Sequence, residues 1–413
     1  MKLFYSDILN NSKYSWDYLI TDLKHLNFYN PYCYHSDFYT IFKNIILSLI
    51  LREEIILLDS DFSQSELNTL IGSKDITQYN KPINNSELKG LENEEELLKM
   101  IKKVNSKWSV TLFTSGTTGL PKKVKHSFHS ITRFVKISNK FKTNVWGFAY
   151  NPTHMAGIQV LFQALLNGNS IVRLFGLPKE LIFQSIKNSQ ITHISATPTF
   201  YRLLLPAIGV YQEVIRITSG GEKFDDKTFF QLRKIFPNAK ITNVYATTEA
   251  GTLFAAKDDI FTVKAEMQQY VKIHKNELLI NKEMMGNTDI NITKWYNTGD
   301  IVEIVSNNPL QIKFISRNNE MINVGGYKVN PGEIEEAIRC IEGVQDVRVF
   351  PLKNSISGNI ISCEIVKNNP KLEESNIIFN LRSKFQDYKI PRIIKFVDKL
   401  LTTRTGKIKR DQI

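Results

Sequence analysis

The sequence predicts an α/β protein in which helices cover β-sheets, followed by a small and mobile α+β cap. Between Trp108 and Asp300, short apolar segments typical of buried strands alternate with segments of helical periodicity. A strand and helix pattern of its own runs through residues 317–413. With 413 residues the chain can form two or three domains. We therefore expect a large domain over residues 1–316 and a cap over 317–413.

Local patterns predict the elements of these domains in order. Strands are expected where short apolar runs occur, at 55–58, 108–113, 123–128, 191–196 and 214–218. Helices are expected where apolar residues recur at helical spacing, at 92–104, 183–188 and 227–235. A further helix should begin at Pro331, because proline and acidic residues are favoured in a first turn.

Composition limits the function without identifying it. The net charge is +12, but the basic residues are spread along the whole chain and no aromatic–basic nucleic-acid motif occurs, so no nucleic-acid partner is expected. The three cysteines lie far apart, which argues against a disulfide framework or a zinc site. His126 and His129 have no evident third metal ligand. A signal peptide pattern is absent, and the apolar run at 45–51 is too short to span a bilayer. These features favour the cytoplasm.

The most informative segment lies between two predicted strands. It combines hydroxyls, two glycines and a lysine in Thr114-Ser115-Gly116-Thr117-Thr118-Gly119-Leu120-Pro121-Lys122. Glycine lets the backbone approach a ligand closely, and hydroxyls, N–H groups and a cation suit a polyphosphate. The common G-x-x-x-x-G-K-[ST] loop is excluded, because Pro121 precedes the lysine, Lys123 follows it, and the next segment is a strand rather than a helix.

Three further motifs carry polar groups at the ends of apolar runs. Thr248-Glu249 follows Tyr245, and a carboxylate close to a polyphosphate is favourable only if it binds a cation. Asp300 follows Thr-Gly at an expected strand start, where it is well placed to accept bonds from two vicinal hydroxyls. The turn Gly325-Gly326 can approach a narrow ligand without side-chain obstruction.

A fifth motif, the C-terminal Arg404-Thr-Gly-Lys407, would by itself indicate only a solvated basic tail. Together and in this order, the five motifs resemble those of the superfamily of AMP-forming acyl-CoA synthetases, adenylation domains and luciferases. The resemblance runs from about Ile55 to Lys409.

The resemblance implies a role for each motif. Residues 114–119 and Lys122 would bind the ATP phosphates, and Glu249 would bind Mg²⁺ beside Thr248 at the α-phosphate. The adenine and ribose would contact Gly220, Gly221, Glu222, Tyr245, Asp300 and Arg317. Lys407 would neutralise charge between a carboxylate substrate and the α-phosphate.

The same resemblance implies a reaction in two steps. A carboxylate would attack ATP, forming an acyl-adenylate and releasing pyrophosphate. The cap would then rotate about Asn319 and bring Gly325-Gly326 over the adenylate, where the phosphopantetheine thiol of CoA would attack. His154 would border the acyl pocket and thiol channel, although such a residue can also be no more than a neighbour of a helix cap. The segment 152–168 resembles small-acid and o-succinylbenzoate CoA ligases more than amino-acid-activating domains.

The sequence departs from the superfamily pattern at several points. The region before the phosphate loop and the stretch between Glu249 and Asp300 are short. Ala246 and Lys123 stand where glycine is usual, and Asn318-Asn319 stand where the hinge often has aspartates.

Two alternatives remain open. The acceptor could be an acyl or peptidyl carrier protein, although no aspartate that would hold a substrate ammonium follows His154. Alternatively, the chain could be a non-catalytic nucleotide-binding scaffold, against which the intact Lys122, Glu249 and Lys407 argue.

Overall fold

The parallel strands of one large sheet position most of the predicted site. The computed structural model describes residues 2–72, 75–84, 86–104, 107–114, 122–207, 209–324, 327–354, 358–404 and 406–409, with the backbone alone at Thr114 and Asn319. Its largest sheet has eight strands, parallel except for the two edge strands β14 and β2. In spatial order they are β14 (Gly251–Ala256), β13 (Lys240–Thr247), β12 (Arg216–Gly220), β11 (His193–Ala196), β9 (Val145–Phe148), β10 (Ser170–Arg173), β1 (Leu3–Asp7) and β2 (Ser12–Ser15).

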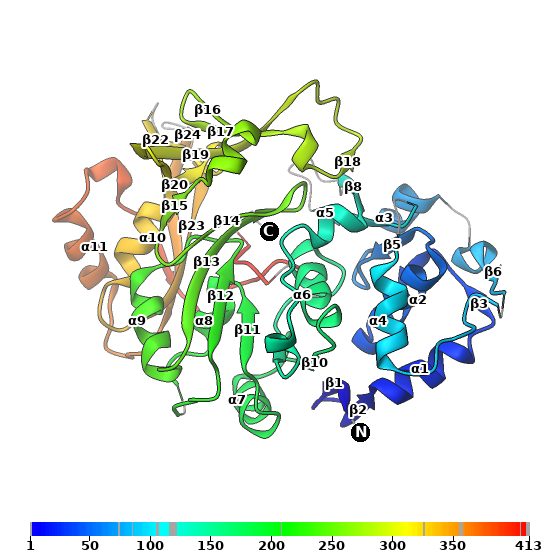
Figure 1. Cartoon of the computed structure of the whole chain (residues 1–413). Coiled ribbons are helices and arrows are strands. Elements are labelled where there is room, and N and C mark those ends of the chain that lie inside the picture. The colour runs from blue at the N-terminus through cyan, green and yellow to red at the C-terminus, as the bar shows by residue number, and fades with distance from the viewer. Residues whose placement is uncertain are drawn as a thin grey trace.

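Helices connect these parallel strands, as the alternating pattern predicts. They are α6 (Met155–Leu165), α7 (Lys179–Asn188), α8 (Pro198–Leu203) and α9 (Asp226–Ile235), while the short helix α5 (Phe128–Thr132) precedes β9. Figure 1 shows α6 between the large sheet and the N-terminal helices. This helix buries Ile158, Leu161 and Phe162 completely, in an apolar cluster that the N-terminal helices share. The expected helices at 183–188 and 227–235 are confirmed as α7 and α9.

A second sheet of five strands brackets the glycine-rich segment. Its order is β18 (Asn287–Thr288), β8 (Lys122–Ser127), β7 (Ser109–Thr114), β5 (Ile55–Leu58) and β4 (Tyr32–Tyr34). Because β7 and β8 pair antiparallel as far as Thr114 and Lys122, these two residues, which flank the glycine-rich segment in the sequence, lie side by side. The helices of this region are α1 (Trp16–Lys24), α2 (Phe38–Leu51), α3 (Gln64–Ile71) and α4 (Glu94–Lys102), and β3 (Phe28–Tyr29) pairs with β6 (Lys81–Pro82).

A third sheet follows the large one in the chain. Its order is β15 (Ile260–Thr262), β20 (Leu310–Arg317), β19 (Trp295–Asn307), β17 (Glu277–Asn281) and β16 (Val271–His274). The prediction that Asp300 lies at a strand start is wrong. The strand already begins at Trp295, because residues 295–297 pair with β17 before Gly299 shifts the register at a positive φ of 73°.

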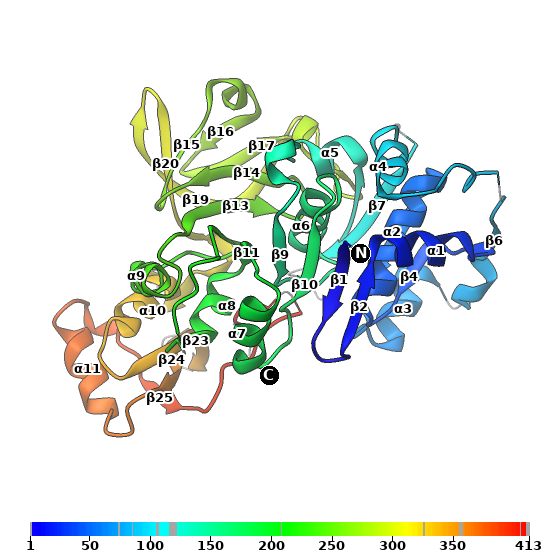
Figure 2. The ribbon, with the colours of Figure 1, turned by 60° about the horizontal axis from the view of Figure 1, so that its bottom comes forward.

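The expected cap is a separate α+β unit with its own apolar core. It contains β21 (Ile322–Val324), β22 (Tyr327–Val329), α10 (Pro331–Arg339), β23 (Val344–Asn354), β24 (Gly358–Lys367), α11 (Glu374–Arg382) and β25 (Ile393–Phe396). Asn330 caps α10 by accepting a bond from the N–H of Gly332, so the predicted helix start at Pro331 is confirmed. Figure 2 shows the cap beside α8 and α9 and the C-terminal tail returning toward the large sheet.

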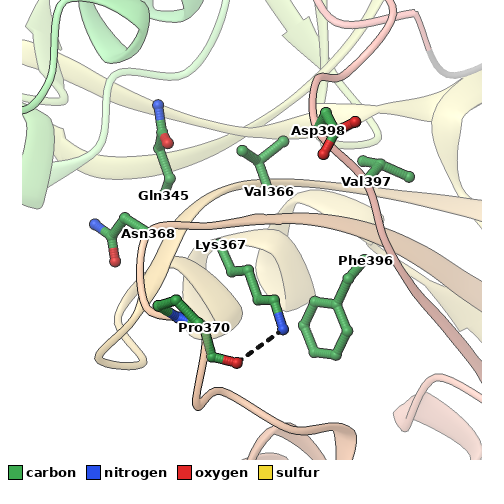
Figure 3. A pocket seen from close by; sticks show the side chains of 8 residues that line it. All are labelled: Gln345, Val366, Lys367, Asn368, Pro370, Phe396, Val397 and Asp398. Atoms are coloured by element: carbon green, nitrogen blue, oxygen red, sulfur yellow. Dashed lines mark hydrogen bonds between the residues drawn. The ribbon is translucent and has the colours of Figure 1, made fainter.

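A shallow hollow of about 390 Å³ lies on the cap itself, between the ends of β24 and β25 (Figure 3). The Lys367 ammonium crosses it to the carbonyl of Pro370 and lies over the Phe396 ring. None of the predicted site residues lines it. Short 3-10 helices lie at Ile76–Tyr79, Asn139–Phe141, Ala265–Tyr270, Lys282–Met284, Asn318–Glu320 and Asp387–Lys389. Among the helices of the described residues, none is long and apolar enough to cross a membrane.

We predict that Gly157→Ala lowers the free energy of unfolding by about 1–3 kcal/mol. A Cβ atom at Gly157 would come within 2.3 Å of the backbone oxygen of Asn151, so the start of α6 would have to move. Urea denaturation measures the effect. Gly209→Ala is the control, because its new Cβ would lie 3.6 Å from the nearest atom, an ordinary contact. Equal stability of both variants would contradict the prediction.

Candidate active site

The carboxyl ends of neighbouring parallel strands bring several predicted residues to one edge of the large sheet. Gly220 ends β12, with Gly221 and Glu222 directly after it, and Thr248 follows β13. Since β12 and β13 are paired parallel neighbours, these segments lie side by side. This edge is where ligands bind in parallel α/β sheets.

The carboxylate of Glu222 joins this edge to the C-terminal tail. One oxygen, Oε2, accepts bonds from the N–H and the hydroxyl of Thr199, at 3.0 and 2.7 Å. The other oxygen accepts a bond from the N–H of Ile408 at 3.2 Å. The sequence predicts Glu222 as an adenine-contacting residue, and that prediction stays untested. Its contact with the tail was not predicted, because the partners are 186 residues apart.

Lys407 therefore reaches the site from the cap. Its Cε lies 3.0 Å from the position that a Cβ of Gly221 would occupy, so glycine leaves the space that the lysine fills. Burial lowers the pKa of Lys407, and the charge of Arg317 acts in the same direction. The carboxylates of Glu222 and Asp300 act against the shift. The structure thus places the ammonium group of a partly buried lysine among the predicted nucleotide-binding residues.

Arg404 anchors the same tail to the N-terminal region. Its guanidinium pairs with Asp61 at 2.8 Å and with both oxygens of Glu66 at 3.0 and 3.1 Å. These bonds lower the pKa of Glu66 to about 2. Further along the tail, the Thr197 hydroxyl donates to the carbonyl of Gly406. Arg404 therefore has a definite docking contact, which its position in a basic tail did not indicate.

Asp300, Arg317 and Tyr245 form one hydrogen-bonded group. The carboxylate of Asp300 accepts from the Tyr245 hydroxyl at 2.5 Å and from Nε of Arg317 at 2.7 Å. Asp300 is only 5% exposed. Burial alone would lower the pKa of Arg317, but the adjacent Asp300 raises it overall. The arginine therefore stays charged next to the carboxylate that is expected to bind ribose.

The ring of Tyr245 also has protein neighbours. Phe314 stacks against it at a centroid distance of 4.1 Å, and Phe254 at 5.7 Å. Adenine stacking on Tyr245 stays a prediction, and the base would have to share the ring surface with these side chains.

The backbone around Thr248 and Glu249 is held by residues that the sequence did not single out. His126 bonds through Nε2 to the carbonyl of Thr248 at 2.8 Å, and the N–H of Gly286 donates to the carbonyl of Glu249 at 2.7 Å. The Tyr296 hydroxyl donates to Oε1 of Glu249 at 3.2 Å. His126 is thus a structural residue and not a metal ligand paired with His129.

Glu249 fits the expected Mg²⁺ as a single carboxylate ligand. Within the described residues, no group of three or more histidine, cysteine, aspartate or glutamate side chains is arranged to hold a metal. Mg²⁺ is usually held by one or two carboxylates together with water and substrate phosphates, so the carboxylate of Glu249 is a suitable ligand type. Lys122 lies partly buried at the start of β8, at the end of the phosphate loop.

His154 belongs to a polar group that the sequence only partly revealed. Its Nε2 lies 2.7 Å from Oδ2 of Asp59, whose other oxygen accepts from the amide of Asn151 at 2.9 Å. Asp59 is 5% exposed; its burial would raise its pKa, but His154, Asn151 and Arg404 lower it overall. His154 precedes α6 and its side chain makes no capping bond.

Some predicted residues lie outside the described residues. These are Ser115, Gly116, Thr117, Thr118 and Gly119 of the phosphate loop and Gly325 and Gly326 of the cap. The side chains of Thr114 and Asn319 are also outside the description.

Two family models match the chain. The model described as AMP-binding enzyme covers residues 52–275, more than half of the chain, and the model described as AMP-binding enzyme C-terminal domain covers 333–407. The chain belongs to the AMP-binding enzyme family. Membership agrees with the resemblance that the five motifs indicate.

Curated relatives include proteins named as CoA ligases and one named as a bacitracin synthase. A 2-succinylbenzoate–CoA ligase of Staphylococcus aureus is 27% identical over 328 residues, which are 73% of this chain and 66% of that protein. Bacitracin synthase 3 of Bacillus licheniformis is 24% identical over 351 residues, 74% of this chain and 5% of the synthase. The chain thus spans about two thirds of the first relative's length and a small part of the second.

Solved structures share the fold. The o-succinylbenzoate CoA synthetase of Bacillus subtilis in complex with its acyl-adenylate intermediate has a TM-score of 0.71 at 16% identity, covering 100% of this chain and 95% of the other. ATP-bound MatB of Rhodopseudomonas palustris also scores 0.71, at 15% identity and with 98% and 94% coverage. These matches confirm a large N-terminal domain followed by a cap.

We predict that stability falls as the pH drops from about 6.5 to about 4, partly through His126. Burial lowers the pKa of this histidine from 6.5 to about 4. In that interval the unfolded chain binds a proton that the folded chain does not, so His126 costs up to about 1.4 kcal/mol per pH unit. Urea denaturation at pH 7 and pH 5 measures the effect.

His126→Gln provides the comparison. The variant should be less stable at pH 7, because it loses a buried bond, but it should lose less stability between pH 7 and pH 5. It should keep part of the pH dependence, since burial also lowers the pKa of His193 to about 4. An identical pH dependence in both proteins would show that His126 does not titrate as described.

Proposed function

We propose that this protein activates a small carboxylic acid with ATP, forming an acyl-adenylate and pyrophosphate, and then transfers the acyl group to the thiol of CoA. The observation that carries the proposal is the position of Lys407. The tail brings this residue from the cap to Gly221 at the edge of the large sheet, with Asp300 and Arg317 close enough to influence its charge.

The first step brings two anions together. The carboxylate oxygen must approach the α-phosphorus of ATP while pyrophosphate leaves, so the site must supply positive charge where negative charge develops. Lys407 can supply it between the reactants, and Lys122 can supply it at the phosphates. Mg²⁺ bound by Glu249 would neutralise phosphate charge. Asp300, already aligned by Tyr245 and Arg317, would orient the ribose.

The second step requires a thiol to replace Lys407 at the adenylate. We expect the cap to rotate near Asn319 and to present Gly325-Gly326 there, as the resemblance implies. The group of His154 and Asp59 would then border the acyl and thiol channel. Its 2.7 Å contact fixes the direction of the imidazole, so His154 is held in one orientation at the start of α6.

CoA is the acceptor that the relatives favour, since two of them, matched over 68% and 66% of their own length, are named CoA ligases. A second candidate is loading of an acyl or peptidyl carrier protein, an alternative that the motif resemblance leaves open. We favour an enzyme over a non-catalytic scaffold, because the tail carries Lys407 up to Gly221 and leaves its side chain only partly exposed.

Hydroxylamine trapping tests the proposal directly. The protein is incubated with ATP, Mg²⁺ and aryl, short-chain, long-chain, dicarboxylic or amino acids, and hydroxamate is measured. Hydroxamate from one class of acid establishes activation and identifies that class. CoA and a phosphopantetheinylated carrier are then compared as acceptors. No hydroxamate from any class, in protein that binds ATP, would argue against the proposal and favour the scaffold.

We predict that Lys407→Ala slows adenylate formation roughly 10²–10³-fold, because one charge-stabilising donor is lost in a dry site. Thiolysis of a chemically prepared acyl-adenylate should be nearly unchanged, since Lys407 would have left the site by then. Lys409→Ala is the control, because the bonds of Lys409 to other described residues, Arg348 and Leu401, are made by its backbone and survive the substitution. Equal slowing of both steps by Lys407→Ala would refute the separate role in the first step.

A further inference from the structure

A buried arginine connects the large domain to the cap. Arg202, on α8, is 5% exposed. Its Nε lies 3.1 Å from Oδ2 of Asp346, which belongs to β23 of the cap. Within the large domain, the same guanidinium bonds to the Thr199 hydroxyl at 2.8 Å and lies 3.4 Å from Asp225 and 3.7 Å from Glu222. One side chain therefore contacts both domains.

Asp346 is buried like Arg202, and its carboxylate contacts two arginines, one from each domain. It is 7% exposed, and its Oδ1 accepts from Nε of Arg339 on α10 at 3.0 Å. Burial would raise the pKa of Asp346, but Arg202 and Arg339 lower it overall, so the carboxylate remains charged. If Arg202 were withdrawn, Asp346 would keep a partner inside the cap.

Burial between the two domains makes the Arg202–Asp346 ion pair strong, and it also allows the two residues to part when the domains separate. Removing one partner of a buried ion pair is costly, because it leaves a charge without compensation in a dry place. Separation of the domains is different, because both charges would regain water at the moment they part. The pair therefore favours one cap position without making the other inaccessible.

The pair is also linked to Lys407 through Glu222. Oε2 of Glu222 faces Arg202 and accepts both bonds from Thr199, while Oε1 accepts from the N–H of Ile408, the residue after Lys407. Thr199 itself accepts a bond from Arg202. The guanidinium thus orders the carboxylate that holds the lysine-bearing tail.

We propose that Arg202 and Asp346 form a latch that holds the cap in the acid-activating position, with Lys407 in the site, and that this latch opens before the thiol step. The inference rests on the proposed two-step function. Arg202 and Asp346 are positioning residues, since they act through the tail and touch no substrate. No motif in the sequence marked either one.

Another ion pair at the same interface provides a matched control. Lys223 and Glu336 lie 2.6 Å apart across the domains, but their side chains are 43% and 39% exposed. Exposed pairs contribute little. Glu336→Gln should therefore change neither step appreciably, which separates the buried latch from general weakening of the interface.

The kinetic test uses Arg202→Met, Asp346→Asn and the double variant. Adenylate formation is measured by hydroxamate, and the second step by thiolysis of a prepared acyl-adenylate. Each single variant should slow the first step roughly tenfold or more and leave the second unchanged or faster. The double variant should lose about as much as the slower single one, because a shared interaction is lost only once.

Hydrogen–deuterium exchange provides a readout that needs no substrate. In both single variants the tail at 401–409 should exchange faster, since the N–H of Ile408 loses its ordered acceptor. Exchange in the β23–β24 ladder of the cap should stay close to that of the unchanged protein. Asp346→Glu, which keeps the charge, should restore part of the protection.

The outcomes are distinguishable. Equal slowing of both steps, additive effects in the double variant, or unchanged exchange of the tail would overturn the latch. If the unchanged protein activates no acid, the proposed function fails, and the exchange experiment still decides whether Arg202 and Asp346 hold the cap.

Discussion

The docking of the C-terminal tail across the ends of the parallel strands is the interaction on which the site depends. Neighbours of Lys407 on the tail are held at the edge that is expected to bind the nucleotide, and they carry the lysine there. The N–H of Ile408 bonds to Glu222, and Arg404 pairs with Glu66. Gly221 leaves the space that the lysine occupies. The large domain therefore provides the space beside Gly221, and the C-terminal tail provides the ammonium group of Lys407 that fills it.

A tail of this kind satisfies two requirements that conflict. Activation of an acid requires a positive charge in a dry site, where it acts most strongly on developing negative charge. Transfer to a thiol requires the same space to be vacated. Polar contacts help to hold the cap, and they join groups that water can solvate after separation, such as Arg202 and Asp346. An apolar interface of the same size would hold the two domains together without such a release.

The sequence was sufficient to predict local features and insufficient to predict contacts between distant ones. Alternating apolar segments predicted the large sheet and its helices, because strand and helix periodicities are properties of short windows. The motif order indicated that Asp300, Arg317 and Lys407 meet, and the structure places them close together. Their chemical roles, and those of the phosphate loop, remain predictions.

The contacts that were missed join residues far apart in the chain. Asp59 meets His154 across 95 residues, and Arg202 meets Asp346 across 144. Such a charged residue has no signature of its own, because in a sequence window it is indistinguishable from a solvated one. The early start of β19 was missed for a similar reason: pairing with β17 extended the strand beyond its apolar residues.

The most direct measurement follows the oxygen of the substrate carboxylate. The acid is labelled with the heavy oxygen isotope, and the products are analysed by mass spectrometry after turnover with ATP, Mg²⁺ and CoA. If the carboxylate attacks the α-phosphorus, one labelled oxygen must appear in AMP and none in pyrophosphate. Label in inorganic phosphate, with ADP as the nucleotide product, would show attack at the γ-phosphorus and would contradict the account of this site.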